Sequence, residues 1–544
     1  MNNHYYTPEG VRDIIPSEYD TKSELTDNIL SLMKQEGFLL MQTPSFEYFD
    51  VFASNIGTVP SSQLYKFYDK EGNTLVLRPD FTPAMARAFS KLYFNVSSPV
   101  KLCYSGNTFI NGDDLNGRLK ESTQIGAELY NDDSCEADAA IIHLVVNCMK
   151  TMGFNDFVVS VGNGNFFKGL CEELGISEAE ELSLLSLISA KNYYKAKELL
   201  ASLNIDKEHT DLIVNISDSY TSKESLYELK DKVNNDKCRK ALDRLIKIAD
   251  LLDESDNNGY ISIDLGLLNK YNYYTGVLFR AYTYGSGDAI IKGGRYDNLV
   301  SKFGKPAPAI GFGISVDDAI IALSGQKDTG YTGNKYLTFA LTKGRLADKT
   351  MNILEKAGIS CEQLKDKETR KLIFVNEELK LRFFLAKGPD VPTYVEHGVA
   401  DIGVVGSDTI REENRKVLEV LDLMIGKCRM CVCGPKSASG LLKTRDIIKV
   451  ATKYPKIAKA YFNEERHQSV DIIKLNGSIE LAPIVGLSDC IVDIVETGST
   501  LRENGLEVLE EICDLSARMI VNPVSMRLQS KRINDLIDRI KEEL

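Results

Sequence analysis

Hydrophobic and polar positions follow two different patterns in the two halves of this 544-residue chain. In the first half, apolar residues at helical spacing predict an amphipathic helix over Ser17–Glu36 and a long helix over Glu136–Met152. Residues Leu119–Leu129 alternate polar and apolar side chains, which predicts a half-exposed antiparallel strand. Leu, Lys and Glu at helical spacing predict a helical insertion at about 165–257. These elements predict an α+β domain with an antiparallel sheet.

In the second half, short strands and helices alternate. The pattern predicts strands at Tyr336–Thr342, Leu381–Ala386 and Ile402–Val405, with helices at Ala347–Ala357 and Val391–His397. Such alternation predicts a parallel or mixed sheet that binds ligands beyond the carboxyl ends of its strands.

The segment between the two patterns, Ser324–Asn334, is small, polar and rich in glycine, which predicts a linker. The expected domains are therefore residues 1–323 and residues 335–544.

Composition narrows the class of protein. With 43% hydrophobic and 26% charged residues, the chain can bury more than one core. A net charge of -13 and a pI of about 5.2 argue against general binding to nucleic acids or membrane surfaces. Eleven cysteines without disulfide-framework spacing, no secretion signal and no membrane-spanning apolar stretch lead us to expect a cytoplasmic protein.

The candidate chemistry is concentrated after a predicted strand at Cys490–Val495. A turn of small and hydroxyl residues follows, Glu496-Thr497-Gly498-Ser499-Thr500, and then a short predicted helix from Leu501. A strand, a small-residue turn and a helix start direct backbone N–H groups at a phosphate. The acids Asp493 and Glu496 suit a ligand that also carries ribose hydroxyls or Mg²⁺. The turn therefore predicts a phosphoribosyl pyrophosphate site, and an ordinary loop with a Thr-rich helix start is the structural alternative.

Four motifs of the first half occur in a characteristic order. They are Leu77-Arg78-Pro79-Asp80-Phe81-Thr82, Gly117-Arg118 with Gln124 and Glu128, Tyr273-Tyr274-Thr275-Gly276, and Gly293-Gly294-Arg295-Tyr296-Asp297. Together they closely resemble the histidyl-tRNA synthetase catalytic domain, a class II aminoacyl-tRNA synthetase fold, over about residues 5–323. The resemblance implies a histidine-binding pocket formed by Asp80, Thr82, Arg118, Gln124, Glu128, Tyr273 and Tyr274.

The departures from that family concern its phosphate-binding arginines. Ile110 follows Phe109 where the family has an arginine, the third motif ends in Asp317 and Asp318, and Asn269 replaces another arginine. Each preorganised donor of this kind is worth roughly 3–4 kcal/mol of transition-state stabilisation. We therefore expect histidine binding without adenylate formation and without tRNA. This half resembles the regulatory subunit that accompanies short-form ATP phosphoribosyltransferases.

Residues 335–544 resemble the catalytic subunit of the short-form ATP phosphoribosyltransferases, a two-lobed α/β fold like the periplasmic binding proteins. The motifs that carry this resemblance are Leu341-Thr342-Lys343-Gly344-Arg345-Leu346, the run from Gly388 through Asp390 to Asp408, and Leu475-Asn476-Gly477-Ser478-Ile479-Glu480, leading to the Glu496–Thr500 turn. The resemblance implies transfer of phosphoribose to adenine N1 of ATP, the first step of histidine synthesis.

We expect the catalytic residues to be Glu496, Thr497, Gly498, Ser499 and Thr500. The expected further substrate contacts are Lys343, Gly344, Arg345, Asp390, Asp408, Lys427, Arg429, Glu480, Asp493 and Leu501. Mg²⁺ is expected to arrive on pyrophosphate and not on a metal-binding cluster of the protein.

These expectations describe a homo-oligomeric fusion in which histidine inhibits phosphoribosyl transfer. The first alternative is a histidyl-tRNA synthetase-like amino-acid-binding protein without phosphoribosyl transfer. The others are an aminoacyl-tRNA ligase with an appended domain, and a solute-binding or sensor module.

Overall fold

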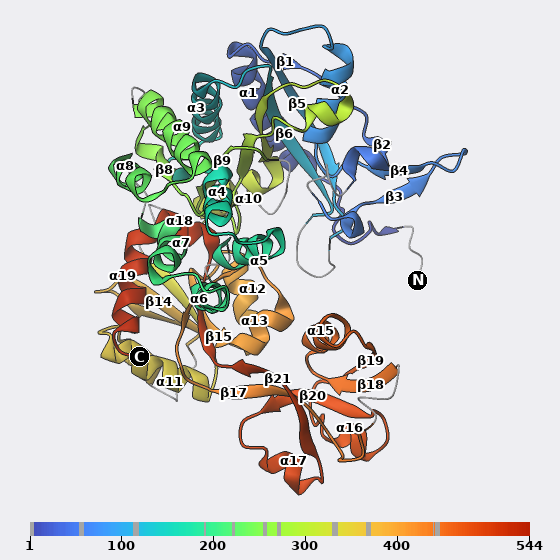
Figure 1. Cartoon of the computed structure of the whole chain (residues 1–544), viewed down its shortest axis with the longest axis vertical. Helices are drawn as coiled ribbons and strands as arrows, with labels where there is room; N and C mark the ends of the chain where they lie inside the picture. The colour runs from blue at the N-terminus through green and yellow to red at the C-terminus, as the bar shows by residue number, and fades with distance from the viewer. Residues whose placement is uncertain are drawn as a thin grey trace. The chain divides into compact units, whose positions relative to one another are not determined.

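The computed structural model describes residues 5–53, 59–112, 119–189, 192–219, 223–253, 258–268, 274–328, 336–365, 371–438, 440 and 447–544. The chain divides into two compact units, Met1–Gly333 and Asn334–Leu544 (Figure 1). The predicted linker begins too early, because Ser324–Asp328 complete the helix α10 (Val316–Asp328). Its remainder, 329–334, lies outside the described residues.

The described residues of the first unit form a central eight-stranded sheet with neighbouring strands mainly antiparallel. In spatial order its strands are β1 (Leu39–Leu40), β5 (Val100–Phe109), β6 (Glu121–Tyr130), β11 (Ala309–Ser315), β10 (Ile291–Arg295), β9 (Val277–Thr283), β7 (Phe157–Asn163) and β8 (Ile261–Ile263). A smaller sheet contains β2 (Phe46–Tyr48), β4 (Thr74–Leu77) and β3 (Lys66–Tyr68). The antiparallel class II arrangement expected from the sequence is confirmed.

Helices cover both faces of the large sheet. On one face, α1 (Pro16–Gln35) packs against β5 and β6, and α3 (Cys135–Thr151) packs against β7, β9 and β11. Ile29 and Ile125 are fully buried in this core. On the other face, α2 (Thr82–Leu92) packs through aromatic rings, and the Phe89 and Tyr130 centroids lie 4.1 Å apart. Offset aromatic stacking of this kind is favourable beyond its area burial.

The predicted helical insertion follows β7 directly. Its helices are α4 (Gly164–Glu173), α5 (Glu178–Ser189), α6 (Tyr193–Ser202), α7 (Lys207–Ser219), α8 (Lys223–Lys232) and α9 (Asp236–Asp253). Within the first unit, α9 packs on α4 and α3, so the insertion is joined to the main core.

The second unit consists of two lobes, each built on its own sheet. The first lobe contains β13 (Ile373–Asn376), β14 (Leu381–Ala386), β12 (Leu337–Thr342), β15 (Ile402–Gly406), β22 (Ala517–Val521) and β16 (Leu418–Asp422) in that spatial order. The second lobe contains β19 (Ser469–Lys474), β18 (Ile447–Thr452), β20 (Cys490–Val495), β17 (Cys428–Gly434) and β21 (Glu507–Leu515). The chain crosses between lobes after β16 and again before β22, which confirms the two-lobed mixed α/β fold.

Short helices follow the strands of both lobes. The first lobe carries α11 (Arg345–Lys356), α12 (Val391–Glu396), α13 (Ser407–Glu413), α18 (Pro523–Leu528) and α19 (Ser530–Lys541). The second lobe carries α15 (Pro455–Ala460), α16 (Leu481–Ile484) and α17 (Ser499–Glu503). Among the helices of the described ranges, none is long and apolar enough to cross a membrane.

Candidate functional site

The turn after β20 has the local geometry of an anion-binding loop. Gly498 adopts a φ of 69°, a left-handed conformation that glycine takes without a steric penalty, and it precedes α17. The first backbone bond of the helix runs from Arg502 N to Gly498 O at 3.2 Å. The amides of residues 499–501 precede that bond and lie at the positive end of the helix. The side chains of Thr497, Ser499 and Thr500 are exposed, so the turn presents hydroxyl groups to solvent.

Two contacts hold this turn in shape. The Thr497 and Ser499 hydroxyls are 3.1 Å apart, and Arg502 donates to the Thr497 carbonyl at 3.2 Å. Leu501 is buried beside Val495, which anchors α17 to the second lobe. Its side chain is therefore part of the core, and only its backbone amide can contact a ligand. A substrate contact at Leu501, as expected from the sequence, would therefore be made by that amide.

Two carboxylates stand where β20 ends. Asp493 is half-buried, and burial raises its pKa to about 6, with the nearby Glu480 acting in the same direction. The Ile494 amide, 2.8 Å from Asp493 Oδ1, and the charge of Lys453 oppose this shift. Glu496 is exposed at the start of the turn. The structure thus brings the predicted acids to the carboxyl end of one strand.

The predicted residues of the first lobe also gather at strand ends. Lys343, Gly344 and Arg345 follow β12 and are exposed. The loop after β14 contains Gly388, whose missing Cβ would lie 3.7 Å from Thr342 and 3.9 Å from Thr409. These distances place the ends of three strands, β12, β14 and β15, beside one another. The exposed Asp390 belongs to the same loop as Gly388.

The two groups of strand ends meet at the junction between the lobes. Asp408, at the start of α13 in the first lobe, lies near the side chain of Tyr454, which follows β18 in the second. Burial is the main cause that raises the pKa of Tyr454, and the charge of the Asp408 carboxylate is the second. Burial also raises the pKa of Cys428 to about 11, with contributions from Asp408 and Glu496. Asp408 and Glu496 therefore both lie near Cys428, one on each lobe.

The remaining predicted cations differ in their surroundings. Lys427 is exposed at the crossover into β17. Arg429 forms an ion pair with Glu511 on β21, so its charge is already matched by a carboxylate. Sequence reasoning missed Arg502, Lys453 and Tyr454. Arg502 could have been found from its position one helical turn after Gly498, whereas only the sheet topology reveals the other two.

No group of three His, Cys, Asp or Glu side chains within the described ranges is arranged to hold a metal ion. The carboxylates near the turn, Asp493 and Glu480, are oxygen donors of the kind that Mg²⁺ prefers. They fit contact with a Mg²⁺ ion carried in by a pyrophosphate ligand.

In the first unit, the structure brings four of the predicted pocket residues together. Thr82 Oγ1 donates to Glu128 at 2.9 Å, and Gln124 Nε2 donates to Asp80 at 3.3 Å. Tyr296 also donates to Glu128. The Gln124 side-chain oxygen is buried and accepts no hydrogen bond from the described residues. A buried acceptor without a donor is costly and is expected to be satisfied by a ligand or water.

Glycines on two neighbouring strands make room for this pocket. A Cβ on Gly311 would lie 1.6 Å from a Glu128 carboxylate oxygen, and one on Gly313 would lie 2.2 Å from Gln124 Nε2. On β10, a Cβ on Gly294 would approach the Tyr274 ring to 2.8 Å. Because Gly294 pairs with Gly311, Tyr274 lies one strand away from Glu128 on the same face. The predicted residues Arg118 and Tyr273 and the substitution Asn269 lie outside the described residues.

Glu128 is fully buried, and its burial raises the pKa to about 8. The hydrogen bonds from Tyr296 and Thr82 oppose this shift, and the charge of Asp80 adds to it. A pKa of about 8 favours the protonated form of Glu128 at neutral pH. A ligand that brings N–H donors or a positive charge would favour the carboxylate.

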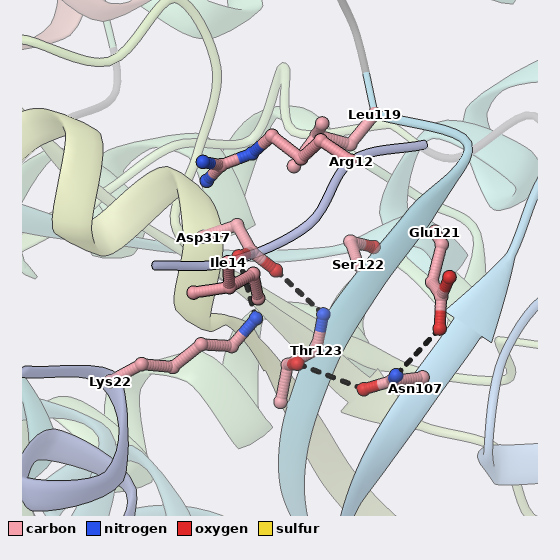
Figure 2. A pocket seen from close by; sticks show the side chains of 9 residues that line it. All are labelled: Arg12, Ile14, Lys22, Asn107, Leu119, Glu121, Ser122, Thr123 and Asp317. Atoms are coloured by element: carbon pink, nitrogen blue, oxygen red, sulfur yellow. Dashed lines mark hydrogen bonds and ion pairs between the residues drawn. The ribbon is translucent and has the colours of Figure 1, made fainter. Parts of the chain in front are cut away.

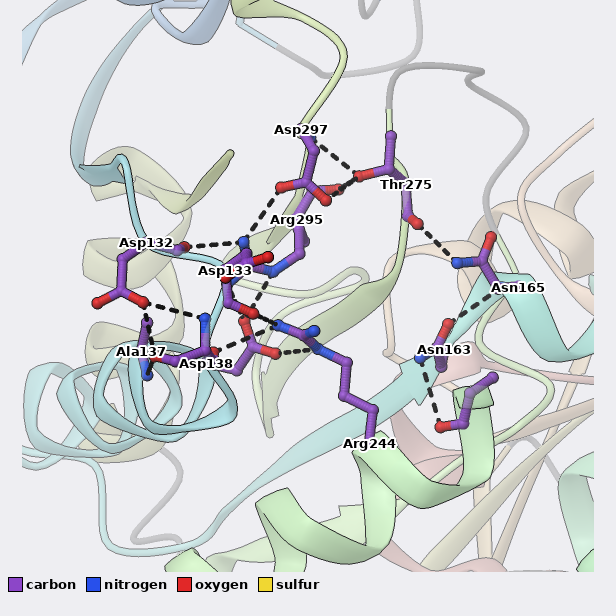
Figure 3. A network of polar contacts seen from close by, with 12 residues as sticks. Asp132, Asp133, Ala137, Asp138, Asn163, Asn165, Arg244, Thr275, Arg295 and Asp297 are labelled. Atoms are coloured by element: carbon purple, nitrogen blue, oxygen red, sulfur yellow. Dashed lines mark hydrogen bonds and ion pairs between the residues drawn. The ribbon is translucent and has the colours of Figure 1, made fainter. Parts of the chain in front are cut away.

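Figure 3 shows the polar network that holds the segment after Tyr274. Thr275 donates its backbone N–H to Arg295 O at 2.7 Å and its hydroxyl to Asp297 at 3.0 Å. Asn165, at the start of α4, donates to Thr275 O at 2.7 Å. The guanidinium of Arg295 in turn contacts the buried Asp138 of α3. The backbone beside Tyr274 is thus fixed from three directions.

A hollow of about 90 Å³ lies near the ends of β5 and β6 (Figure 2). Asp317 lines it, forms an ion pair with Lys22 at 2.7 Å and accepts from Thr123 N at 2.6 Å. Asp318 accepts from Ser315 at 2.7 Å. Asp317 therefore connects α10 with α1 and β6. The hollow is smaller than the roughly 300–1,000 Å³ of typical ligand pockets.

Comparisons with known proteins agree with the division of the chain into two units. Residues 10–319 match the family model described as histidyl-tRNA synthetase, and residues 387–542 match the one described as ATP phosphoribosyltransferase. An ATP phosphoribosyltransferase from Lachnoclostridium phytofermentans is 68% identical over 210 residues, which is 39% of this chain and 98% of that protein. An ATP phosphoribosyltransferase regulatory subunit from Acetivibrio thermocellus is 37% identical over 322 residues, 59% of this chain and 77% of that protein.

A solved structure has a similar fold over most of the chain. An ATP phosphoribosyltransferase regulatory subunit/histidyl-tRNA synthetase from Bacillus halodurans is 26% identical, with a TM-score of 0.56, and the match covers 71% of this chain and 99% of that one. The chain therefore joins a histidyl-tRNA synthetase-like unit to a glycosyltransferase unit. It belongs to the ATP phosphoribosyltransferase family and combines homologues of the catalytic and regulatory subunits of this enzyme of histidine biosynthesis. The alternative without phosphoribosyl transfer is not favoured.

Proposed function

We propose that the second unit transfers phosphoribose from phosphoribosyl pyrophosphate to adenine N1 of ATP, and that histidine bound to the first unit inhibits this transfer. In the reaction, the C1–N1 bond forms as the bond from C1 to pyrophosphate breaks. The sugar passes through an oxocarbenium-like state. Adenine N1 carries no proton in neutral ATP, so the chain needs no general base and acts mainly by positioning its two substrates.

The sugar donor is assigned to the turn after β20. The exposed hydroxyls of Thr497, Ser499 and Thr500 and the amides at the start of α17 support a 5-phosphate contact. Glu496 and Asp493 are assigned to the ribose hydroxyls. Mg²⁺ bound to pyrophosphate supplies the positive charge that stabilises the leaving group.

The phosphates of the two substrates require further cations. Lys343, Arg345 and Lys427 are exposed at strand ends or at the lobe crossover, which supports this role for them. Arg502 joins this set because its guanidinium already contacts the turn. Arg429 is a weaker candidate because Glu511 engages it.

Histidine is assigned to the pocket of the first unit. Asp80 would accept from the α-ammonium group, and the unsatisfied oxygen of Gln124 would accept a second N–H. Glu128 and Tyr274 lie deeper on the same face, where the imidazole would contact them. The observation that carries this assignment is the unsatisfied buried oxygen of Gln124 on the strand that also carries the buried Glu128, a pair suited to a ligand rich in N–H groups.

The regulatory claim is tested by the rate of phosphoribosyl-ATP formation, followed optically, with and without millimolar histidine. Histidine should lower the rate in the full chain, and Glu128→Gln should need more histidine for the same inhibition. Because coupling between sites is reciprocal, substrates should also weaken histidine binding. An unchanged rate with histidine would refute inhibition while leaving the transferase activity intact.

We also propose that the protein is a cytoplasmic homo-oligomer that does not use tRNA. All eleven cysteines lie in the described ranges and are free thiols, which suits a reducing compartment. Closed symmetric assemblies are the commonest form of soluble oligomers. Light scattering tests the assembly. Histidine-dependent exchange between ATP and pyrophosphate tests for adenylate chemistry, which Ile110, Asp317 and Asp318 disfavour.

A further inference from the structure

Helix α13 of the first lobe contacts the second lobe at the start of another helix. The Glu412 carboxylate accepts hydrogen bonds from Lys456 N at 3.0 Å and from Ile457 N at 3.2 Å. These are the first two amides of α15 that can donate, because Pro455 has no N–H. The first helical bond of α15, from Ala458 N to Tyr454 O, comes only after them. Glu412 therefore caps α15 from the opposite lobe.

The cap suits both partners. No side chain of the residue preceding α15 caps that helix, so without Glu412 its leading amides would need another partner. A carboxylate is also favoured at the positive end of a helix. The bond from Ile457 N is partly buried, so solvent screens it less than it would on an open surface.

Other contacts from α13 also reach beyond the first lobe, including one from Lys456 Nζ to Glu413 O at 3.3 Å. Asp408 lies near the side chain of Tyr454, and Arg411 donates to the thiol of Cys513 on β21. At the crossover between lobes, Ser407 N donates to Ser516 O at 2.9 Å, and Ser516 N donates to Ser407 Oγ at 3.2 Å. One short helix thus contacts a helix, a strand and the crossover segment. A rotation of one lobe against the other would break several of these bonds together.

These contacts of α13 lie close to the turn after β20. Asp408 is close to Cys428, and the charge of Glu496 in the turn after β20 also raises the pKa of Cys428. Tyr454 follows β18, which pairs with β20. The orientation that α13 fixes between the lobes therefore sets the separation between the first-lobe strand ends and that turn. Transfer between two bound substrates depends steeply on such positioning.

We propose that Glu412 is a positioning residue for phosphoribosyl transfer, and that its cap on α15 latches the two lobes at the separation that the two substrates require. Glu412 touches no substrate in this role. Its loss leaves the turn and the strand ends intact but lets the lobes move apart, so substrate binding must restore their closure.

The test compares Glu412→Ala with Glu413→Ala in the full chain. Glu413 is the next residue of α13 and carries the same charge, and no described side chain bonds to its carboxylate, so it is a matched control. We expect Glu412→Ala to raise KM for phosphoribosyl pyrophosphate or ATP by about tenfold, typical for loss of a helix cap, with a smaller change in kcat. Glu413→Ala should behave as the unaltered chain.

Hydrogen exchange gives a readout that does not depend on activity. The amides of Lys456 and Ile457 should exchange faster in Glu412→Ala than in Glu413→Ala, and saturating substrates should restore their protection. Equal KM values and equal exchange in the two variants would overturn the proposal. A loss confined to kcat, with KM unchanged, would also overturn it.

Two further variants test whether Glu412 acts through its cap and together with Tyr454. Glu412→Gln keeps one carbonyl acceptor and should fall between the two alanine variants. Tyr454→Phe removes the hydroxyl that meets Asp408, and its effect on KM should be less than additive with that of Glu412→Ala, because both break one latch. Strict additivity would contradict a shared latch. Absence of transfer in the unaltered chain would instead refute the function proposed above.

Discussion

Arg295 and Asp138 form an ion pair with a 2.5 Å contact, and the Asp138 side chain is fully buried while that of Arg295 is 2% exposed. Asp138 also binds Arg244 of the helical insertion, at 2.6 Å, through its other oxygen. One carboxylate on α3 therefore joins α9 to the strand that holds Thr275 beside Tyr274. Removing one partner of such a buried group is costly because the other charge stays behind.

The first prediction concerns Arg244. Arg244→Gln should weaken histidine binding by about fivefold to tenfold, because Asp138 loses one partner and Arg295, which fixes Thr275, is free to shift. Titration calorimetry of the full chain with histidine measures the change. Thr275→Val should act on the same path, so the two effects on binding free energy should not add.

A neighbouring ion pair supplies the control. Lys247 of α9 and Glu136 of α3 form an ion pair at 2.7 Å, with side chains 54% and 58% exposed. Lys247→Gln removes an ion pair between the same two helices without touching Asp138. It should leave histidine affinity unchanged, since exposed pairs contribute little. Equal affinities in the Lys247 and Arg244 variants would show that the buried network does not position the pocket.

The second prediction follows from the raised pKa of Glu128, about 8. A carboxyl group with a raised folded-state pKa binds its proton at neutral pH, and a ligand that donates N–H groups favours the ionised form. Histidine binding should therefore release up to one proton at pH 7, and affinity should rise as pH increases from 7 to 8. Calorimetry in two buffers of different ionisation enthalpy counts the released protons.

The variant Glu128→Gln isolates that group. It should bind histidine more weakly and release no proton, while Glu121→Gln, on the same strand but outside the pocket, should keep the proton release. If histidine bound to the unaltered chain with no proton exchange at pH 7, Glu128 would not be the titrating contact.

The sequence was most informative where a site is local. The turn from Glu496 to Thr500 could be predicted because strand, glycine and helix start are consecutive in the chain. The pocket residues Gln124 and Glu128 are distant in sequence from Asp80, and only the resemblance to a known family connected them before the structure did. Long-range pairing of strands is not encoded in local periodicity.

The same limit explains what was missed. Tyr454 and Glu412 act across two lobes, and neither belongs to a local pattern that marks the contact. Arg429 looked like a free cation in the sequence, but the register of β17 and β21 brings Glu511 beside it. The helix ending at Asp328 continues through a glycine that had suggested a linker, because glycine lowers helix propensity without forbidding it.

The third prediction tests the turn directly. Thr500→Ala or Glu496→Ala should lower kcat by about a hundredfold or more, the loss expected for one preorganised contact to the reacting substrate. Both side chains are exposed, so the melting temperature should change little. Glu503→Ala, at the end of α17, is the control for a general effect on this helix. A folded Glu496→Ala variant with normal turnover would remove the turn from the catalytic site.

The fourth prediction concerns Arg502, which sequence reasoning missed. Its guanidinium donates to Thr497 O at 3.2 Å, so it is poised beside the turn. Arg502→Ala should raise KM for phosphoribosyl pyrophosphate more than KM for ATP, because the turn is assigned to the sugar donor. Steady-state kinetics with each substrate varied separately measures this. Arg502→Lys should recover part of the loss, since the charge remains but the planar donor geometry does not.

The fifth prediction separates the effects of Asp493 on function and on stability. Burial raises the pKa of this residue to about 6. Because the ribose contact uses the carboxylate, kcat/KM for phosphoribosyl pyrophosphate should fall as pH decreases through about 6. The substrate phosphate also titrates near this pH, so the profile of Asp493→Asn provides the comparison. That variant should be slow at every pH and should lack the part of the profile that belongs to Asp493.

The contribution of Asp493 to folding stability should depend on pH in the opposite direction to kcat/KM. A folded-state pKa above the unfolded value means that the folded chain binds the proton more tightly, so ionisation of Asp493 disfavours folding as pH rises through this range. Asp493→Asn should therefore melt at a higher temperature than the unaltered chain at pH 8, and the difference should vanish near pH 4. If the Asp493 carboxylate lowers stability but is needed for transfer, Asp493→Asn should show both slow transfer and the higher melting temperature. A variant that melts lower at pH 8 would mean that the carboxylate is structural.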